Sequence, residues 1–165
     1  MKVIFLDVDG VLNSEMWNEN HQYEIQNGVC IDETKVELLS MIIKKTGAVI
    51  VLHSGWRFWL DDKLKPLNRE ADYLLFQFKK YGIAIHDITP DFSTDEIKRT
   101  KKFSLVKAGE IIDWIRVHHV TKYLVLDDLD LFMDEIIPYQ IRTNPAAGLT
   151  EQDAEEAIEK LNGFK

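Results

Sequence analysis

Short apolar runs recur along the chain and predict the strands of a sheet. Each run is rich in β-branched and aliphatic residues, as is typical of strands covered on both faces in a parallel sheet, although run length alone would also fit buried helix. The runs occupy residues 3–6, 48–52, 83–85, 123–126 and, after Pro138, 139–141.

Helical patterns with recognisable ends lie between these runs. In the first pattern Val36, Leu39 and Ile43 share one face, and similar apolar spacing recurs in three later segments. The expected boundaries are Asp32 or Thr34 to Gly47, Asn68 to Gly82, a helix preceded by Ser104, and a helix opened by a capping box of Thr150 with Asp153.

The alternation of strands and helices predicts an α/β fold. A mostly parallel sheet of about five strands would carry helices on both faces. Residues 13–31 and the polar residues 87–103 do not match the core pattern and are interpreted as inserts in a single domain of residues 1–165. Ligands of such sheets bind beyond the carboxyl ends of the strands.

Composition and charge narrow the class of protein. The chain has 165 residues, of which 45% are hydrophobic, enough for one core without structural zinc. Its single cysteine, Cys30, excludes an intramolecular disulfide. The 20 Lys and Arg residues against 28 Asp and Glu residues give a net charge of −8, which disfavours binding along an extended nucleic-acid duplex.

The sequence also carries an expectation about location. Asp7 and Asp9 interrupt the apolar start before a signal-peptide core can form. No stretch approaches the roughly 20 apolar residues of a membrane span. We therefore expect a soluble, cytoplasmic protein with no membrane partner.

Paired acids follow the first predicted strand. Asp7 and Asp9 stand where the apolar run stops, and Gly10 permits a turn. One carboxylate can act as nucleophile and ligand of a hard cation while the other handles a proton. A calcium loop also begins Asp-x-Asp-Gly, but its later acidic ligands are missing at the required spacing.

Polar residues also end the second and fourth predicted strands. Ser54 and Gly55 offer a hydroxyl and backbone N–H groups to a phosphate, and Arg57 can bind phosphate or pair with a surface carboxylate. Asp127 and Asp128 would repel each other unless a cation is shared. Each group alone is also ordinary turn chemistry. Together they predict a magnesium-assisted phosphoryl-transfer site.

With these motifs the chain resembles the haloacid dehalogenase (HAD) superfamily over roughly residues 1–150. The finer form of the motifs is most similar to the small HAD domains associated with Swiss-army-knife RNA repair proteins. The matching segments are Phe5-Leu6-Asp7-Val8-Asp9-Gly10-Val11-Leu12-Asn13, Val51-Leu52-His53-Ser54-Gly55-Trp56-Arg57, Leu126-Asp127-Asp128 and Gly148-Leu149-Thr150.

The resemblance implies a Rossmann-like HAD fold with a minimal cap domain or none, and a role for each motif residue. Asp7 would attack phosphorus to form an aspartyl-phosphate, and Asp9 would protonate the leaving group and then activate water. Ser54 would hold a phosphoryl oxygen. The implied cofactor is Mg²⁺, bound by Asp7, the backbone carbonyl of Asp9, and Asp127 and Asp128.

The superfamily's third motif is a lysine, which we assign to Lys107, just inside the helix after Ser104. Lys98, Lys101 and Lys102 belong to the preceding polar stretch, and Lys107 could alternatively be a solvated helix residue. The expected phosphate- and substrate-binding set is Gly10, Ser54, Gly55, Arg57 and Lys107.

Two segments contain residues that could contact the substrate. The basic run Lys98–Lys102 could grip a phosphate or a nucleic-acid end, or be a solvated loop. In the insert 13–31, expected to form a flap, Trp17, His21 and Tyr23 could stack on a base or pack at the domain edge. The insert is too short for a large cap domain, so the site is expected to be open.

The remaining aromatic residues and His53 are assigned no functional role. Trp56, Phe58, Trp59 and Leu60 are interpreted as packing residues, and His53, which faces away from Ser54 in a regular strand, is not assigned to a metal.

The predicted function is Mg²⁺-dependent phosphomonoester hydrolysis. The expected substrate is a phosphorylated small molecule or a nucleic-acid end. The alternatives are phosphoryl transfer to an acceptor other than water and a non-catalytic domain that binds phosphate or a partner protein. A response-regulator receiver is disfavoured because its phosphoacceptor would stand on a middle strand.

Overall fold

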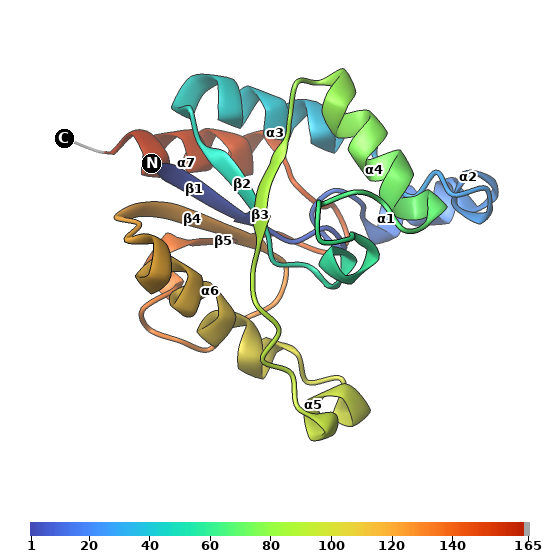
Figure 1. The fold of residues 1–165 in the computed structure, drawn as a ribbon. Helices are drawn as coiled ribbons and strands as arrows, with labels where there is room; N and C mark the ends of the chain where they lie inside the picture. Colours follow the sequence, from blue (N-terminus) through green and yellow to red (C-terminus); the bar gives the residue numbers. More distant parts are fainter. Residues whose placement is uncertain (164–165) are drawn as a thin grey trace.

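Five parallel strands form one sheet in the computed structural model, which describes residues 1–163 (Figure 1). The strand order is β3-β2-β1-β4-β5. This confirms the predicted α/β fold with a parallel sheet. The strands are β1 (Lys2–Leu6), β2 (Val49–Leu52), β3 (Ile85–Ile88), β4 (Lys122–Asp127) and β5 (Gln140–Arg142).

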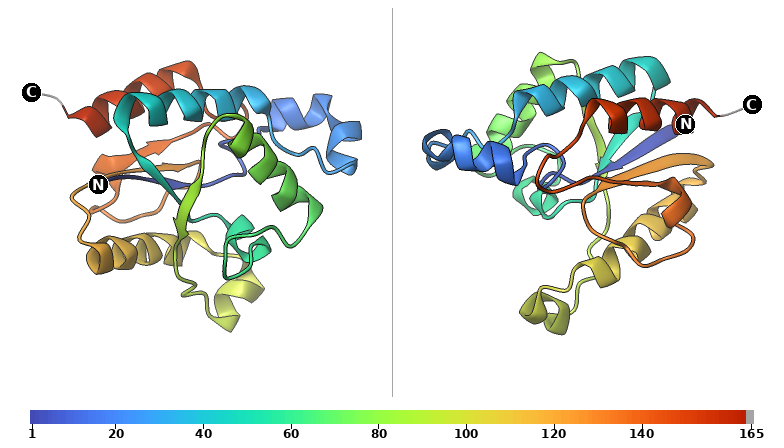
Figure 2. Two further views of the ribbon diagram at one scale, coloured as in Figure 1. Left: turned by 45° about the horizontal axis from the view of Figure 1, so that its top comes forward. Right: turned by 180° about the vertical axis from the view of Figure 1, so that it is seen from behind.

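Helices cover both faces of the sheet (Figure 2). On one face α3 (Glu33–Thr46), α4 (Arg69–Lys80) and α7 (Glu151–Asn162) pack on alternate strand residues such as Ile4 and Leu6. On the other face α6 (Ser104–His118) packs on the residues between them, such as Val3 and Phe5. The odd-numbered residues of β1 therefore point toward α6.

Most predicted helix ends are confirmed. Asp32, rather than Thr34, caps α3 by accepting the Thr34 N–H, and Gly47 ends it with φ of 71°. Asn68 caps α4, and the Thr150–Asp153 capping box is complete. Ser104 is the first residue of α6 and makes no capping bond, because Phe103 occupies the cap position.

The third strand begins later than predicted. We expected residues 83–85, but the Ile83 N–H bonds to the Phe78 carbonyl at 2.8 Å and so belongs to the turn that ends α4. Pairing with β2 starts at Ile85. Because β3 is an edge strand, it accommodates the polar residues His86 and Asp87, which the apolar pattern did not predict.

Both predicted inserts contain short helices. Residues 13–31 hold α1 (Glu15–Asn20) and α2 (Gln22–Gln26). The second insert starts after Ile88, and its α5 (Asp95–Thr100) extends away from the sheet as an arm (Figure 1). Among residues 1–163, no helix is long and apolar enough to cross a bilayer.

Candidate active site

Three buried polar residues stand side by side where the central strands end. Leu6 is in register with Leu52 and with Leu126, and the Asp7 and His53 N–H groups continue this pairing by one residue. Asp7, His53 and Asp127 therefore lie at the same level and on the α6 side of the sheet. Each residue places one atom that could bind a metal ion, a carboxylate oxygen or a ring nitrogen, within 4.8 Å of the others.

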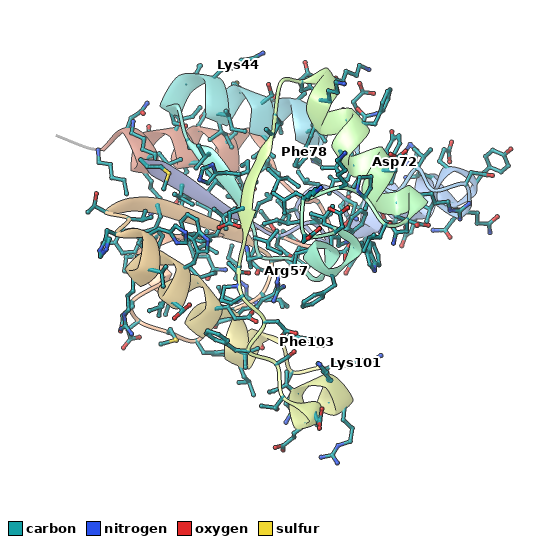
Figure 3. All side chains as sticks on the ribbon, in the orientation of Figure 1. Lys44, Arg57, Asp72, Phe78, Lys101 and Phe103 are labelled. Carbon is teal, nitrogen blue, oxygen red and sulfur yellow. The ribbon has the colours of Figure 1, made fainter. Side chains whose placement is uncertain are left out.

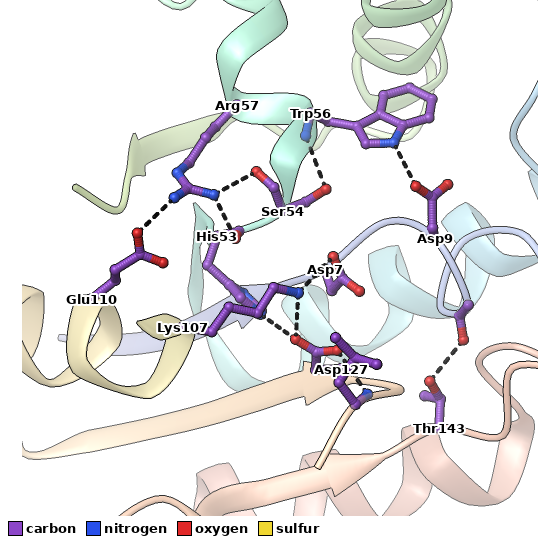
Figure 4. A network of polar contacts seen from close by, with 12 residues as sticks. Asp7, Asp9, His53, Ser54, Trp56, Arg57, Lys107, Glu110, Asp127 and Thr143 are labelled. Atoms are coloured by element: carbon purple, nitrogen blue, oxygen red, sulfur yellow. Dashed lines mark hydrogen bonds and ion pairs between the residues drawn. The ribbon is translucent and has the colours of Figure 1, made fainter. Parts of the chain in front are cut away.

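Lys107 projects from α6 into this cluster (Figure 4). Its Nζ lies 2.9 Å from Asp127 Oδ2 and 3.4 Å from Asp7 Oδ1, and only 8% of the residue is exposed. Burial opposes its charge, but Asp7 and Asp127 outweigh burial and raise the pKa of Lys107. Lys107 is thus a buried, paired cation rather than a solvated helix residue.

His53, one of the three strand-end residues of the cluster, was not predicted to take part. Its Nε2 lies 2.8 Å from Asp127 Oδ2, and the residue is fully buried. Burial lowers the pKa of His53, so we assign a neutral ring that donates Nε2–H to the carboxylate. Burial alone would raise the pKa of Asp127, but its contacts with His53 and Lys107 outweigh burial and lower it.

The surroundings of Asp7, the candidate nucleophile, disfavour its ionised form. Burial, followed by the negative charge of Asp127, raises its pKa well above the ordinary value, and Lys107 only partly compensates. Asp128 adds a further negative charge near Asp7, and its own pKa is raised by burial and by Asp127. The site gathers more negative than positive charge.

This imbalance fits a divalent cation. Asp7 and Asp127 of the buried cluster would supply carboxylate oxygens, the donors that Mg²⁺ prefers, and Asp128 lines the cavity above them. Lys107 is the lysine within ion-pair distance of the cluster among residues 1–163. A bound cation would stabilise the ionised form of Asp7 and offset the repulsion between the acids.

Asp9 lies on an exposed turn beyond Asp7, and both of its carboxylate oxygens are held. The Asn13 side-chain amide donates to Oδ1 at 2.9 Å, and the Trp56 indole N–H donates to Oδ2 at 3.2 Å (Figure 4). Asn13 Oδ1 also accepts the Gly10 N–H. The orientation of Asp9 is therefore fixed although the residue is exposed.

The Gly10 turn leaves no room for a side chain. Gly10 has φ of 81°, and a Cβ there would lie 2.6 Å from the Asp128 carboxylate. Its carbonyl accepts the Thr143 hydroxyl at 2.7 Å. Gly10 therefore allows the turn after β1 to approach Asp128, the acid that follows β4.

Ser54 is buried and caps the 3₁₀ helix η1 (Gly55–Trp59). Its Oγ accepts the Trp56 backbone N–H at 3.1 Å. Because the hydroxyl acts as an acceptor in this contact, its hydrogen can still be donated to a phosphoryl oxygen. Gly55 follows at the exposed start of η1.

Arg57 forms an internal clasp with Glu110 of α6. The guanidinium Nη2 donates to Glu110 Oε2 at 3.0 Å, and Nη1 donates to the carbonyls of His53 and Ser54. Glu110 also accepts the Phe92 N–H at 2.9 Å. Glu110 is buried, so the expected surface carboxylate partner is not what Arg57 binds. These contacts hold the Ser54 loop against α6 and occupy both terminal nitrogens of the guanidinium, whereas Nε has no hydrogen-bond partner among residues 1–163.

A cavity of about 490 Å³ opens over these groups. Asp7, Asp9, Ser54 and Lys107 line its floor together with Asp128. Its walls also contain aromatic side chains that the sequence predicts to be packing residues. Trp56 is buried as predicted, but the prediction is wrong for Phe58 and Trp59, which are exposed by 51% and 38%.

The two segments predicted to contact substrate differ in their relation to the cavity. Trp17, His21 and Tyr23 of the first insert do not line it, and Trp17 stacks on His21 instead. The basic residues Lys98–Lys102 are exposed on and just after α5, between the cavity-lining Ser93 and Phe103.

One comparison with known proteins identifies the family. A family model described as the HAD domain in Swiss Army Knife RNA repair proteins matches residues 3–154. The chain belongs to this family. The searches of curated proteins and of solved structures gave no match. The matched range includes Asp7, Asp9, Ser54, Lys107 and Asp127 of this HAD domain.

The sequence analysis did not predict the role of several residues that shape the site of this HAD domain. His53 and Glu110 were detectable in principle: His53 ends a strand at the level of Asp7, and Glu110 lies one helical turn after Lys107. Asn13 and Trp56 carried no such signal, because their contacts with Asp9 depend on how two turns meet.

Proposed function

We propose that this HAD domain is a Mg²⁺-dependent phosphomonoester hydrolase that acts through an aspartyl-phosphate on Asp7, with a nucleotide or a nucleic-acid terminal phosphate as substrate. The observation that carries the proposal is the arrangement around Asp7: Lys107 lies 3.4 Å from it, and the Ser54 hydroxyl and the fixed carboxylate of Asp9 line the same cavity.

In the first step an Asp7 carboxylate oxygen attacks phosphorus. The bond from phosphorus to the ester oxygen breaks as the new bond forms, and Asp9 gives its proton to the departing oxygen. The Ser54 hydroxyl donates to a phosphoryl oxygen, and Lys107, 3.4 Å from Asp7 Oδ1, orients Asp7 and favours its ionised form.

In the second step water attacks the phosphorus of the aspartyl-phosphate. Asp9, now ionised, takes a proton from the water, and the bond between phosphorus and the Asp7 oxygen breaks. Inorganic phosphate leaves, and both carboxyl groups return to their starting states. The contacts from Asn13 and Trp56 hold Asp9 in place for both proton transfers.

Asp7, Asp127, Asp128 and the backbone carbonyl of Asp9 are the groups that would hold Mg²⁺. The cation supplies neutralisation of negative charge on the phosphoryl oxygens and on Asp7. Lys107 and His53 both contact Oδ2 of Asp127, and the Leu129 N–H donates to its Oδ1, so the orientation of this carboxylate is fixed.

The first experiment is release of phosphate from p-nitrophenyl phosphate with and without Mg²⁺, with Asp7→Asn in parallel as the control for contaminating enzymes. We expect release that requires Mg²⁺ and is confined to the wild type. Nucleotides and oligonucleotides with a terminal phosphate are then compared as substrates. Undiminished release by purified Asp7→Asn would contradict the assignment of the nucleophile.

A further inference from the structure

Three aromatic side chains in the cavity wall have no role in the chemistry described above. Phe58 and Trp59 belong to η1, and Phe103 immediately precedes α6. They are exposed by 51%, 38% and 39%, yet they line the same cavity as Asp7 and Ser54. Figure 3 locates Phe103 at the start of α6, with Arg57 nearer the sheet and Lys101 farther out on the arm. Large apolar side chains gathered at an open cavity are typical of a ligand-binding surface.

We propose that these three residues, the aromatic shelf, bind the nucleobase of the substrate by stacking. This inference rests on the proposed phosphatase function and names the part of the substrate that is recognised beyond its phosphate. The shelf would select nucleotides and single-stranded ends over phosphate esters that carry no base.

The position of Asp9 determines which side of the phosphate the shelf faces. Asp9 gives its proton to the departing oxygen, so the organic part of the ester lies beside Asp9. The indole of Trp56 binds Asp9 and packs on Trp59, with ring centroids 4.9 Å apart. The group attached to the phosphate therefore lies next to Trp59 rather than over the buried Asp127.

The charge of this wall favours a neutral ring over a second phosphate. Asp91 and Glu110 line it in addition to the acids of the floor. The cavity's two cations, Arg57 and Lys107, are already engaged in ion pairs. A polyphosphate or an acidic group would be repelled here, whereas a base needs only an aromatic face on which to stack.

Stacking also sets a structural requirement on the substrate. The Arg57 guanidinium lies 4.4 Å from the centre of the Phe58 ring and so helps to orient it. A base that is stacked inside a duplex cannot lie on the shelf until it has left its neighbours. The terminal nucleotide of a single strand meets this requirement directly.

The test is calorimetric titration of Asp7→Asn protein in Mg²⁺ with adenosine 5′-monophosphate, adenosine 3′-monophosphate and ribose 5-phosphate. We expect at least one adenosine monophosphate to bind about five-fold or more tightly than ribose 5-phosphate. Adding Trp59→Ala or Phe103→Ala should reduce this ratio toward one. Trp59→Phe, which keeps an aromatic face, should retain most of it.

Phe76→Ala is the matched control, because Phe76 is a 61% exposed aromatic residue of α4 outside the cavity. It should leave the ratio unchanged. Three results would contradict base binding by the aromatic shelf. They are equal affinities for the three ligands, no binding of any of them, and an affinity ratio that is unchanged in both alanine variants.

Phosphate release by the wild type separates the shelf from the phosphatase. Equal hydrolysis of ribose 5-phosphate and both adenosine monophosphates, together with equal binding, would overturn the shelf and leave the phosphatase standing. A calorimetric preference for the base without hydrolysis of any substrate would support base binding and contradict the phosphatase.

Discussion

Asp7 and Asp9 are two residues apart, yet their surroundings have little in common. Asp7 is buried beside Asp127, His53 and Lys107, and we call these four residues the inner half of the site. Asp9 is exposed and is held by Asn13 and Trp56, and these three residues form the outer half.

The two halves are stabilised by different interactions. The inner half holds more negative than positive buried charge, so loss of Lys107 would leave carboxylates without compensation in a poorly solvated place, whereas loss of one carboxylate would reduce their repulsion. Hydrogen bonds of the outer half orient a group that water can still solvate. We therefore expect inner-half substitutions to change stability and activity together, and outer-half substitutions to change activity far more than stability.

The largest effect is expected for Lys107→Met, which removes the cation of the inner half. Unfolding by urea in EDTA should show that the free energy of unfolding falls by about 3–5 kcal/mol, because breaking a buried ion pair leaves the remaining buried charges uncompensated. Turnover should fall at least about a hundred-fold. Lys80→Met, which breaks the exposed pair with Glu33, is the control and should unfold nearly as the wild type. Wild-type stability of Lys107→Met would contradict the dependence between inner-half charges.

Asp9→Asn should lower kcat by about 10²–10⁴ while the melting temperature changes little, because an exposed proton donor is lost. The loss should be smaller for p-nitrophenyl phosphate, whose leaving group needs little protonation, than for ribose 5-phosphate. An equal loss on both esters would argue against Asp9 as the acid.

Asp7→Asn should stabilise the protein in EDTA at neutral pH, although it abolishes turnover. The pKa of Asp7 is raised in the folded state, chiefly by burial, so ionising it costs stability as pH rises through that pKa. Asn does not titrate. Thermal unfolding should show the difference at pH 7.5, and it should shrink at pH 4 or when Mg²⁺ is added to both proteins. A variant that is less stable than the wild type at both pH values would be inconsistent with this cost.

The smallest effect is expected for Trp56→Phe, which removes the N–H donor to Asp9 and keeps a ring in place. Loss of one hydrogen bond that orients the acid should lower kcat about ten-fold. Trp114→Phe is the matched control, since its indole N–H donates to Asp87 at 2.8 Å outside the cavity. If both variants keep wild-type kcat, the contact from Trp56 does not position Asp9.

The placement of the inner-half residues could be predicted from the sequence better than that of the outer-half residues, because strand geometry determines it. Alternation along each strand places Phe5 and Asp7 on one face, and likewise Val125 and Asp127. Parallel pairing then brings the strand ends to one level. His53 follows by the same rule from Val51, but only once the register of β1 with β2 is known, and the sequence does not specify that register.

The features that could not be predicted depend on contacts between segments that are distant in the chain. Arg57 meets Glu110 across 53 residues. Phe58 and Trp59 share apolar character with buried Leu60, and only the absence of a covering element among residues 1–163 leaves them open. The late start of β3 follows from the turn after α4, which uses the Ile83 N–H before the strand can.

The clasp between Arg57 and Glu110 has a consequence for how such domains can diversify. Glu110 fixes the chain at Phe92, and α6 fixes it again beyond Phe103, so both ends of the α5 arm are anchored by residues that the arm itself does not contain. We therefore expect that the arm can lengthen, shorten or be exchanged for another segment while Asp7, Ser54 and Lys107 keep their places. For the same reason we expect the arm to be a position at which a new recognition segment can be grafted without change to the floor of the cavity.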